Sequence, residues 1–199
     1  MQSKTTKNSE IMPVLHKIPA GAIPGDQSVE LFGDRKEKKV YFISNGVTLD
    51  FKKLAQRYKN KLFTQLIADT VAHNDLKHLP YSVALERYAY CVYGSLDHMP
   101  DITVTGFMGR SENFICNQEG CNCQNWLSKQ ISYKGQIIKG RLLDVLLAYR
   151  KGREDAHVAE DLGIERPTLN TYKKQLFQIF GIYSKTELVV LAIEAGIIQ

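Results

Sequence analysis

The chain has 199 residues, of which 44% are hydrophobic and 24% are charged, and its formal net charge is +5. This length suits one medium domain or two small ones with hydrophobic cores, and the modest positive charge favours anionic partners only weakly. No apolar run approaches the roughly 18 residues that a membrane span needs, and the polar start does not look like a secretion signal. We therefore expect a cytoplasmic protein with no membrane partner, whose four cysteines are reduced thiols or metal ligands.

Residues 1–28 contain prolines and few regularly spaced apolar residues, which predicts a flexible arm. Two β-branched and aromatic runs, VYFIS and VTLDF, follow on either side of Asn45-Gly46. Asn-Gly is the dipeptide best suited to the positive φ angles of a type I′ turn. The pattern predicts a β-hairpin near the start of an α+β domain, which we place at residues 29–127.

Two helices are predicted in the rest of this domain. The first begins at Asp50, which can cap a helix, and one face of it is apolar. That face consists of Phe51, Leu54, Ala55, Tyr58, Leu62, Leu66 and Ile67. The second helix runs from Ser82 to Tyr93 and ends at Gly94. Two β-prone runs, ITVTGF and ENFIC, follow between residues 101 and 116.

Three cysteines, Cys116, Cys121 and Cys123, lie within eight residues of one another. Closely spaced thiolates can converge on a zinc ion, which takes four ligands in a tetrahedron. Cys91 or His98 could supply the fourth ligand, although neither has the regular spacing of a CxxC…CxxC site. The sequence leaves open a structural zinc, a redox-sensing cluster and ordinary reduced thiols.

The sequence gives little sign of catalysis. Asp97, His98 and Asp101 could support acid–base chemistry, but no serine or cysteine has a recognisable nucleophile setting. We expect that the protein is not an enzyme and assign no catalytic residue.

The last third of the chain carries four apolar patterns of helical spacing. Residues 128–137 are polar and contain glycine, which predicts a linker or a pairing strand before an all-α domain at 138–199. The helical patterns lie at 142–149, 156–162, 166–180 and 185–193. Gly163 ends the second of them, Pro167 lies in the first turn of the third, and Ser184 to Glu187 match a capping box before the fourth.

The second and third patterns have the spacing of a helix-turn-helix, in which the second helix enters a DNA groove. Charge divides between the two helices. Residues 166–180 carry three basic residues and no acid, whereas residues 152–165 carry five acids and one arginine. This distribution favours contact between the third helix and DNA phosphates.

Several short pieces support a more specific interpretation. They are VAE at 158–160, LGI at 162–164, TLNT at 168–171, FGI at 180–182 and TEL at 186–188. In this order and spacing, the segment from Ile138 to Ile198 resembles the LuxR-type helix-turn-helix domain, which is also found in the NarL and FixJ response regulators. The chain departs from the family pattern at Leu142, Glu165 and Tyr172, where the family usually has glutamate, a serine or threonine cap, and histidine.

The resemblance implies a sequence-specific DNA-binding transcriptional regulator. Its recognition helix, about 166–180, would enter the major groove of double-stranded DNA, and its last helix would help to form a homodimer, at least on DNA. The residues expected at the DNA are Arg166, Thr168, Asn170, Thr171, Tyr172, Lys173 and Lys174. Asparagine can pair with adenine, threonine can meet a thymine methyl group, and lysine neutralises phosphate. RNA polymerase is a candidate partner of such a regulator.

The front domain does not reveal its signal. It lacks the acidic residues and lysine of a phosphoacceptor receiver, and its single tryptophan, Trp126, does not fit the pocket signature of acyl-homoserine-lactone receptors. The alternative from a different class is a ligand- or metal-binding adaptor whose helical C-terminal domain contacts proteins.

Overall fold

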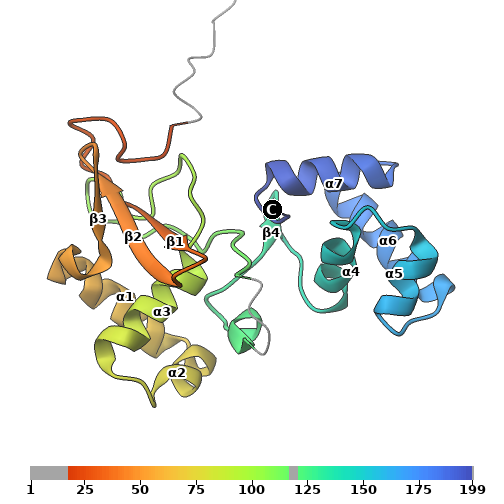
Figure 1. The fold of residues 1–199 in the computed structure, drawn as a ribbon, viewed down its shortest axis with the longest axis horizontal. Helices are drawn as coiled ribbons and strands as arrows, with labels where there is room; N and C mark the ends of the chain where they lie inside the picture. The colour runs from red at the N-terminus through yellow and green to blue at the C-terminus, as the bar shows by residue number, and fades with distance from the viewer. Residues whose placement is uncertain (1–17, 117–120, 199) are drawn as a thin grey trace, which may run out of the picture.

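A computed structural model describes residues 18–116 and 121–198 and divides them into two lobes, each around its own hydrophobic core (Figure 1). The first lobe combines a small antiparallel sheet with helices, and the second is mainly helical. In chain order, the first lobe contains β1 (Glu30–Asp34), β2 (Lys39–Ser44), β3 (Val47–Asp50), the 3-10 turn η2 (Phe51–Lys53), α1 (Gln56–Ala68), α2 (Thr70–Leu76) and α3 (Tyr81–Val92). The layout is therefore a mixed α+β fold, as expected.

The predicted hairpin is confirmed. Strands β2 and β3 pair antiparallel with Ser44 opposite Val47, and Asn45 and Gly46 both have positive φ, 52° and 76°. The sheet also contains β1, which pairs with β2 and which the sequence did not predict. Glu30 and Gly33 interrupt the apolar pattern of β1, because the first is a buried carboxylate and the second lies against Tyr90.

The helix predicted from Asp50 is broken in two. The Asp50 carboxylate accepts a hydrogen bond from Lys52 N at 2.8 Å and so caps only the short turn η2. The chain is extended at Leu54, and α1 begins at Gln56. This break lets Leu54 join the core beside Phe51.

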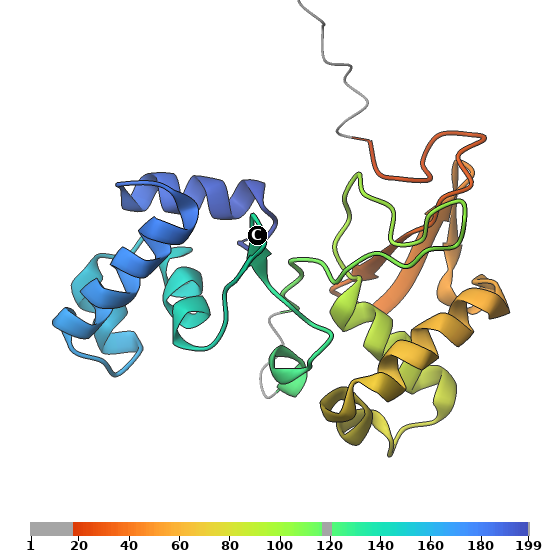
Figure 2. The same ribbon diagram turned by 180° about the vertical axis from the view of Figure 1, so that it is seen from behind.

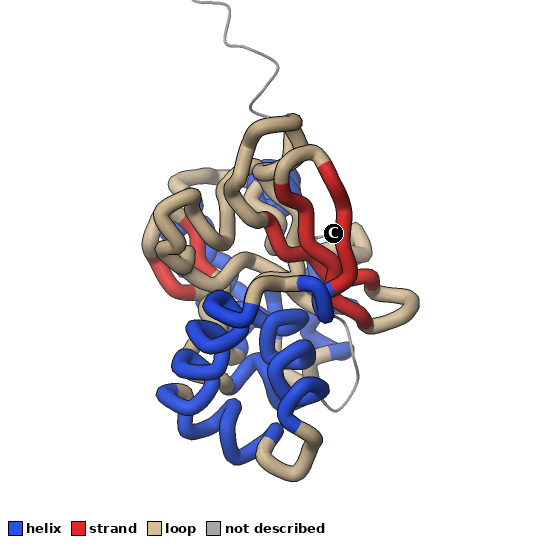
Figure 3. The backbone as a smooth tube through the Cα atoms, turned by 90° about the vertical axis from the view of Figure 1, so that its left-hand side faces the viewer, coloured by secondary structure: helices blue, strands red, loops and turns tan. Residues whose placement is uncertain are grey.

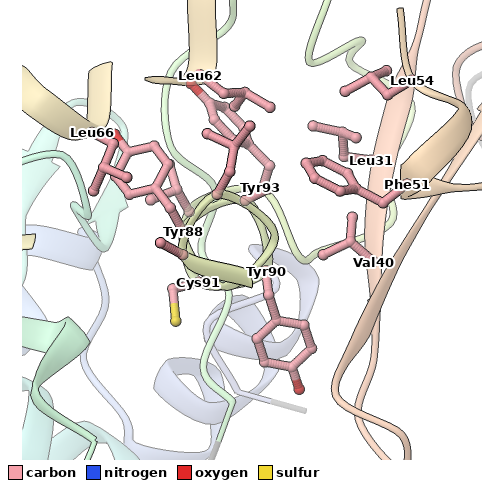
Figure 4. Packing of buried hydrophobic residues seen from close by; sticks show 14 of the residues in the cluster. Leu31, Val40, Phe51, Leu54, Leu62, Leu66, Tyr88, Tyr90, Cys91 and Tyr93 are labelled. Carbon is pink, nitrogen blue, oxygen red and sulfur yellow. The ribbon is translucent and has the colours of Figure 1, made fainter. Parts of the chain in front are cut away.

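Helix α3 matches the predicted second helix and forms the centre of the first core (Figure 4). Tyr88 of α3 and Tyr93, which follows the helix as its C-cap, lie among the apolar residues of α1, and the Cys91 thiol of α3 points away from Leu31 and Leu54. Helix α2, which was not predicted, is short and is capped by Asp69, whose carboxylate accepts hydrogen bonds from the backbone N–H groups of Val71 and Ala72.

The β-prone runs between residues 101 and 116 do not form strands. The segment makes only isolated bridges, in which Ile102 pairs with Val29 and with Met108. A tight turn held by a 2.7 Å hydrogen bond from Gly106 N to Thr103 O folds the segment back on itself. The sheet and loops lie on one side of the lobe and the helices on the other, and Figure 3 shows the same separation from the side.

Residues 18–28 were expected to belong to a flexible arm, but they pack against the first lobe. The Asp26 carboxylate accepts a hydrogen bond from Gly21 N at 2.8 Å, and Gly46 N donates to Gly21 O across the β2–β3 turn. These hydrogen bonds hold the segment in place although it has no regularly spaced apolar residues. The apolar pattern of the sequence therefore did not predict that the segment packs on the lobe. The rest of the predicted arm, residues 1–17, lies outside the described residues.

The second lobe is reached through a short hairpin. The 3-10 turn η3 (Asn122–Asn125) precedes this hairpin and belongs to the first core. The elements that follow are β4 (Ser132–Tyr133), β5 (Gln136–Ile137), α4 (Arg141–Tyr149), α5 (Asp155–Asp161), α6 (Arg166–Phe180) and α7 (Lys185–Glu194). Residues 128–137, expected to form a linker or a pairing strand, contain this strand pair, and Ile131 and Ile138, which flank the two strands, are buried in the second core. The four predicted C-terminal helices all occur close to their expected positions. Figure 2 shows the helical second lobe from behind.

Within the described residues, no single helix has the length and hydrophobicity that crossing a membrane requires. Only α6 and α7 taken together, as a pair bent by 53°, meet these criteria by length and composition.

Candidate metal centre and candidate nucleic-acid interface

All four cysteines of the chain converge at one place in the first lobe. The ligand atoms of Cys91, Cys121 and Cys123 lie within 4.8 Å of one another. The Cys116 side chain is within hydrogen-bond reach of both Cys121 and Cys123. Tetrahedral zinc with sulfur ligands at about 2.3 Å separates its sulfur atoms by about 3.8 Å, so the cluster is close to the size that the ion needs.

Two elements supply these cysteines. Cys91 lies on α3 and is 1% exposed, and Cys123 lies in η3 and is 2% exposed. Cys121 caps η3 and, like Cys116, is partly exposed. The cluster therefore joins α3 to the segment that leads toward the second lobe.

Carboxylates of α2 and its cap hold this segment in position. Asp75 accepts hydrogen bonds from Asn122 Nδ2 at 2.7 Å and from Trp126 Nε1 at 2.8 Å. Asp69 accepts from the backbone N and the hydroxyl of Ser128 at 2.7 Å and 2.6 Å. Burial opposes ionisation of Asp69, but these donors and the N–H of the helix outweigh it and lower the pKa of its carboxyl.

A buried lysine lies beside the thiols. Lys129 is 6% exposed, its Nζ donates to Cys91 O, and the same ammonium lies 5.5 Å from the centre of the Phe114 ring. Buried ammonium groups are rare unless negative charge compensates them. Four thiolates around one Zn²⁺ would leave a net charge of about −2, which this lysine would partly neutralise.

The crowded thiols have strongly shifted pKa values. Hydrogen bonding to Cys121, together with burial, raises the pKa of Cys91 to about 12. The pKa of Cys121 is lowered because the thiols of Cys116, Cys123 and Cys91 stabilise its thiolate, and the pKa of Cys123 is raised in turn. A divalent ion supplies the positive charge that such a cluster needs before every thiol can lose its proton.

The sequence had found three of these four thiols and named two candidates for the fourth ligand. The structure brings in Cys91, whereas His98 is exposed on a separate loop and does not join the described thiols. Sequence spacing could not decide this, because the 24 residues between Cys91 and Cys116 exceed the short spacing of common zinc motifs.

The second candidate site is the outer face of α6. Leu169, Leu176 and Phe180 on its inner face are buried in the second core. The outer face includes exposed Arg166, Asn170, Thr171 and Lys174. The helix has 15 residues and so extends about 22 Å, with its outer face open along most of this length.

Local geometry fixes the angle between α5 and α6. Gly163 ends α5 with a φ of 61°, and the next backbone N–H, that of Ile164, donates to Ala159 O at 2.9 Å. Ile164 then packs on the second core. Gly181 ends α6 in the same way with a φ of 70°. The turn between α5 and α6 is therefore short and well determined, as a helix-turn-helix requires.

Asp155 ties α5 to the two helices that follow it. Its carboxylate forms an ion pair with Lys173 on α6, and Lys185 Nζ at the start of α7 lies 3.6 Å from it. Burial opposes ionisation of Asp155, but the two ammonium groups outweigh it and hold the pKa of this carboxyl below its ordinary value. The group is therefore charged near neutral pH and fixes the position of α6.

Five of the seven residues predicted at DNA are exposed on α6, namely Arg166, Thr168, Asn170, Thr171 and Lys174. The other two turn toward the protein. Tyr172 packs against the second core, and Lys173 is engaged by Asp155. Their inward placement follows from the helical period, because they share the side of α6 that carries Leu169 and Leu176.

Two further residues extend the exposed face. Gln175 and Gln178 are exposed and continue the rows that contain Thr171 and Lys174, respectively, at intervals of four residues. Glutamine can pair with adenine through two hydrogen bonds. Neither glutamine was predicted at the DNA, although the four-residue spacing from Lys174 leads directly to Gln178.

The departures from the LuxR pattern have visible consequences. Glu165 is the N-cap of α6 and makes no side-chain capping bond, so the start of α6 relies on Pro167 in its first turn. Leu142 packs partly buried against the second core. In this chain an apolar contact replaces the polar one that a glutamate would make.

No protein-family model matches the chain, and neither a curated protein nor a solved structure matches it. The LuxR-type resemblance therefore rests on the motif pieces and their spacing alone. The features that bear on function are the exposed face of α6 and the cysteine cluster.

Proposed function

We propose that the protein is a sequence-specific DNA-binding transcriptional regulator of the LuxR type, with α6 as the helix that enters the major groove. The observation that carries the proposal is the division of α6 into a buried apolar face and an exposed face of arginine, lysine and amide side chains. A short, glycine-ended helix precedes it at a fixed angle. A B-DNA major groove is wide enough to admit one such helix.

The exposed residues divide into two roles. Arg166 and Lys174 form no ion pair with any described residue, so both charges are available to phosphates. Asn170 lies between them on the same row and can read adenine, and Gln178 continues that row. Thr171 donates its hydroxyl to Pro167 O, which leaves its methyl group available for an apolar contact with thymine.

A homodimer on DNA belongs to the same proposal. On α7, Val190 and Ile193 are 47% and 52% exposed and lie three residues apart, on one side of the helix. Paired helices of two copies would cover these residues and would place two α6 helices on two half-sites. The half-site spacing in selected DNA would then equal about one helical turn or a multiple of it.

Selection of duplexes from a random pool at low salt tests the proposal. We expect an enriched, two-fold symmetric sequence, and binding that weakens steeply as salt rises. Asn170→Ala should relax the base preference, Lys174→Ala should weaken binding to all sequences alike, and Lys36→Ala, an exposed lysine of the first lobe, is the matched control. The proposal fails if no duplex is enriched and the second lobe recovers protein partners that DNA does not displace, which the adaptor hypothesis predicts.

We propose in addition that the four cysteines hold a structural zinc ion. The observation in its favour is that thiols from α3 and from residues 116–123 meet at one point, with the buried Lys129 beside them. Because every cysteine of the chain is used, the site offers the closed S₄ ligand set of structural zinc. The ion would fix the segment that connects the lobes.

Elemental analysis of the purified protein, combined with thiol titration, tests this second proposal. We expect about one zinc per chain and four thiols that react only after a chelator is added. Cys91→Ser and Cys116→Ser should each lose the zinc, whereas His98→Ala should keep it. Less than about a tenth of an equivalent of zinc, with four thiols reacting at once in the native protein, would contradict the proposal.

A further inference from the structure

A second cluster of potential ligands lies in the first lobe, apart from the thiols. Carboxylate oxygens of Glu30, Asp97 and Glu112 lie within 4.8 Å of one another. They come from β1 and from two loop segments on either side of the turn at 102–108. A fourth carboxyl group, that of Asp101, is 3% exposed and interacts electrostatically with Glu30 and Glu112.

Two oxygens of this cluster are buried and have no hydrogen-bond partner. Glu30 is completely buried, and its Oε1 accepts from Asp97 N at 2.7 Å while its Oε2 has no donor. Glu112 Oε2 accepts from Ser95 N at 2.6 Å while its Oε1 has none. A buried carboxylate oxygen without a partner is costly, so two of them in one cluster indicate that a positively charged group belongs there.

The cluster lies at the wall of a cavity of about 740 Å³ between the two lobes. Asp97, Asp101 and Glu112 line it on one side. The opposite side contains Glu194 and Ala195, at the C-terminal end of α7. The C-terminus of a helix carries partial negative charge, so both sides of the cavity favour a cation.

No described lysine or arginine forms an ion pair with Glu30, Asp97 or Glu112. Arg110 lines the same cavity without pairing with them. Burial and mutual repulsion raise the pKa of Glu30 to about 8 and that of Glu112 to about 9. Either a proton or a metal cation can therefore neutralise the carboxylates of the cluster. The two differ in the arrangement of carboxylate oxygens that each requires.

We propose that Glu30, Asp97 and Glu112 bind one hard divalent cation, such as Mg²⁺, Mn²⁺ or Ca²⁺, at the junction of the lobes. Such ions take carboxylate oxygens at about 2.0 to 2.6 Å, so that oxygens on opposite sides of the ion lie about 4 to 5 Å apart. The spacing of these oxygens falls within that limit. The bordering cavity supplies room for the water ligands that these ions retain.

The site would act on the arrangement of the lobes. Asn113 follows Glu112 directly, and its side chain donates from Nδ2 to Ala195 O and to Ser132 O, both at 2.9 Å. A cation on Glu112 would therefore fix the loop that contacts the end of α7. Since α7 packs on α6, cation binding would also affect the position of α6, the helix proposed to contact DNA.

Titration of the full chain with Mn²⁺, followed by electron paramagnetic resonance, tests the site directly. Mn²⁺ prefers oxygen ligands, so the test does not depend on the thiols or on DNA binding. We expect about one tight Mn²⁺ per chain and competition by Mg²⁺ or Ca²⁺. Glu112→Gln and Asp97→Asn should each weaken this binding by roughly tenfold or more, whereas Glu160→Gln, an exposed acid of α5, should not change it.

Both cluster variants remove charge repulsion, so we expect them to fold, which circular dichroism would check. The proposal is overturned if the full chain binds Mn²⁺ no better than either variant does. It is also overturned if no divalent ion binds and acid alone stabilises the protein, because protons would then occupy the cluster.

Discussion

Phe114 and Ile115 are neighbours in the chain, yet their side chains are buried in different hydrophobic cores. Phe114 is 1% exposed and packs in the first core, and Ile115 is 7% exposed and packs in the second. Asn113 on one side of this pair bonds to the second lobe, and Cys116 on the other side belongs to the thiol cluster. The two lobes are therefore joined at a fixed point, and changes near this point should affect both.

Asn113→Ala should loosen the connection between the lobes. The side chain donates to Ser132 O and Ala195 O and accepts from Ser132 N at 2.8 Å. Losing these three bonds should lower the free energy of unfolding by about 1.5–4.5 kcal/mol, because each contributes about 0.5–1.5 kcal/mol. Urea denaturation measures the loss, and limited proteolysis should cut faster between residues 128 and 140.

Asn60→Ala is a suitable control for this variant, because Asn60 is an exposed asparagine of α1. It should leave both measurements close to those of the parent protein. Equal stability of the two variants would show that the Asn113 contacts do not hold the lobes together.

Lys129→Met should weaken zinc binding without removing a ligand. In the proposed zinc site the buried ammonium would offset the negative charge of the thiolates, and its Nζ bonds to Cys91 O. We expect zinc affinity to fall roughly 10- to 100-fold, the range typical of residues that support metal ligands. Competition with a chromophoric chelator measures the affinity. Lys139→Met, at an exposed position, is the control and should retain the zinc affinity of the parent protein. An unchanged zinc affinity in Lys129→Met would show that Lys129 has a packing role only.

The sequence predicted the elements that depend on local signals. The Asn45-Gly46 hairpin, α3 and the four C-terminal helices follow from turn chemistry and apolar spacing. Strand β1 was not predicted because Glu30, a charged residue that is buried in the structure, interrupts the apolar pattern of the strand. Helix α2 was not predicted because the helix has only seven residues after its Asp69 cap. Both depend on tertiary contacts that no local pattern records.

The candidate sites divide in the same way. The exposed stripe of α6 is periodic and was mostly predicted, although Lys173 and Tyr172 turn inward. Local patterns could not decide between Cys91 and His98 as the fourth ligand. They also could not predict the carboxylate cluster, since Glu30 and Glu112 come together only when β1 packs beside the loop that follows α3.

Acid should destabilise the second lobe through Asp155. Its pKa is lower in the folded chain than the 3.8 of a free carboxyl group, so the unfolded chain binds a proton more readily. The stability from this group is present above about pH 4 and is lost as pH falls through the lower folded pKa. Asp155→Asn should unfold more easily at pH 7, by about 1 kcal/mol, and should show a shallower loss of stability in acid. Glu160→Gln is the matched control, and if its acid profile equals that of Asp155→Asn, the two ion pairs contribute nothing to stability.

The carboxylate cluster should give the opposite pH dependence in protein stripped of divalent cations. The pKa values of Glu30 and Glu112 are raised to about 8 and about 9, so the folded chain holds protons that the unfolded chain releases. The stability that these protons supply is complete below about pH 4.5 and is lost as pH rises through about 8 to 9. The groups facing the pair are Asp97, Asp101 and Lys129. The Asp97 carboxylate raises both pKa values, whereas the Asp101 backbone N–H lowers the pKa of Glu30 and the Lys129 ammonium lowers that of Glu112.

Thermal denaturation between pH 5 and pH 9 measures this dependence, and the Glu112→Gln variant isolates the cluster, because glutamine cannot ionise. We expect the melting temperature of the stripped parent to fall more steeply with pH than that of Glu112→Gln. Added Ca²⁺ or Mg²⁺ should restore the parent at high pH and leave the variant nearly unchanged, since a bound cation replaces the lost protons as the neutralising charge. Parallel pH profiles of the two proteins, with no response to either ion, would mean that the buried carboxyl groups are stabilised by other contacts.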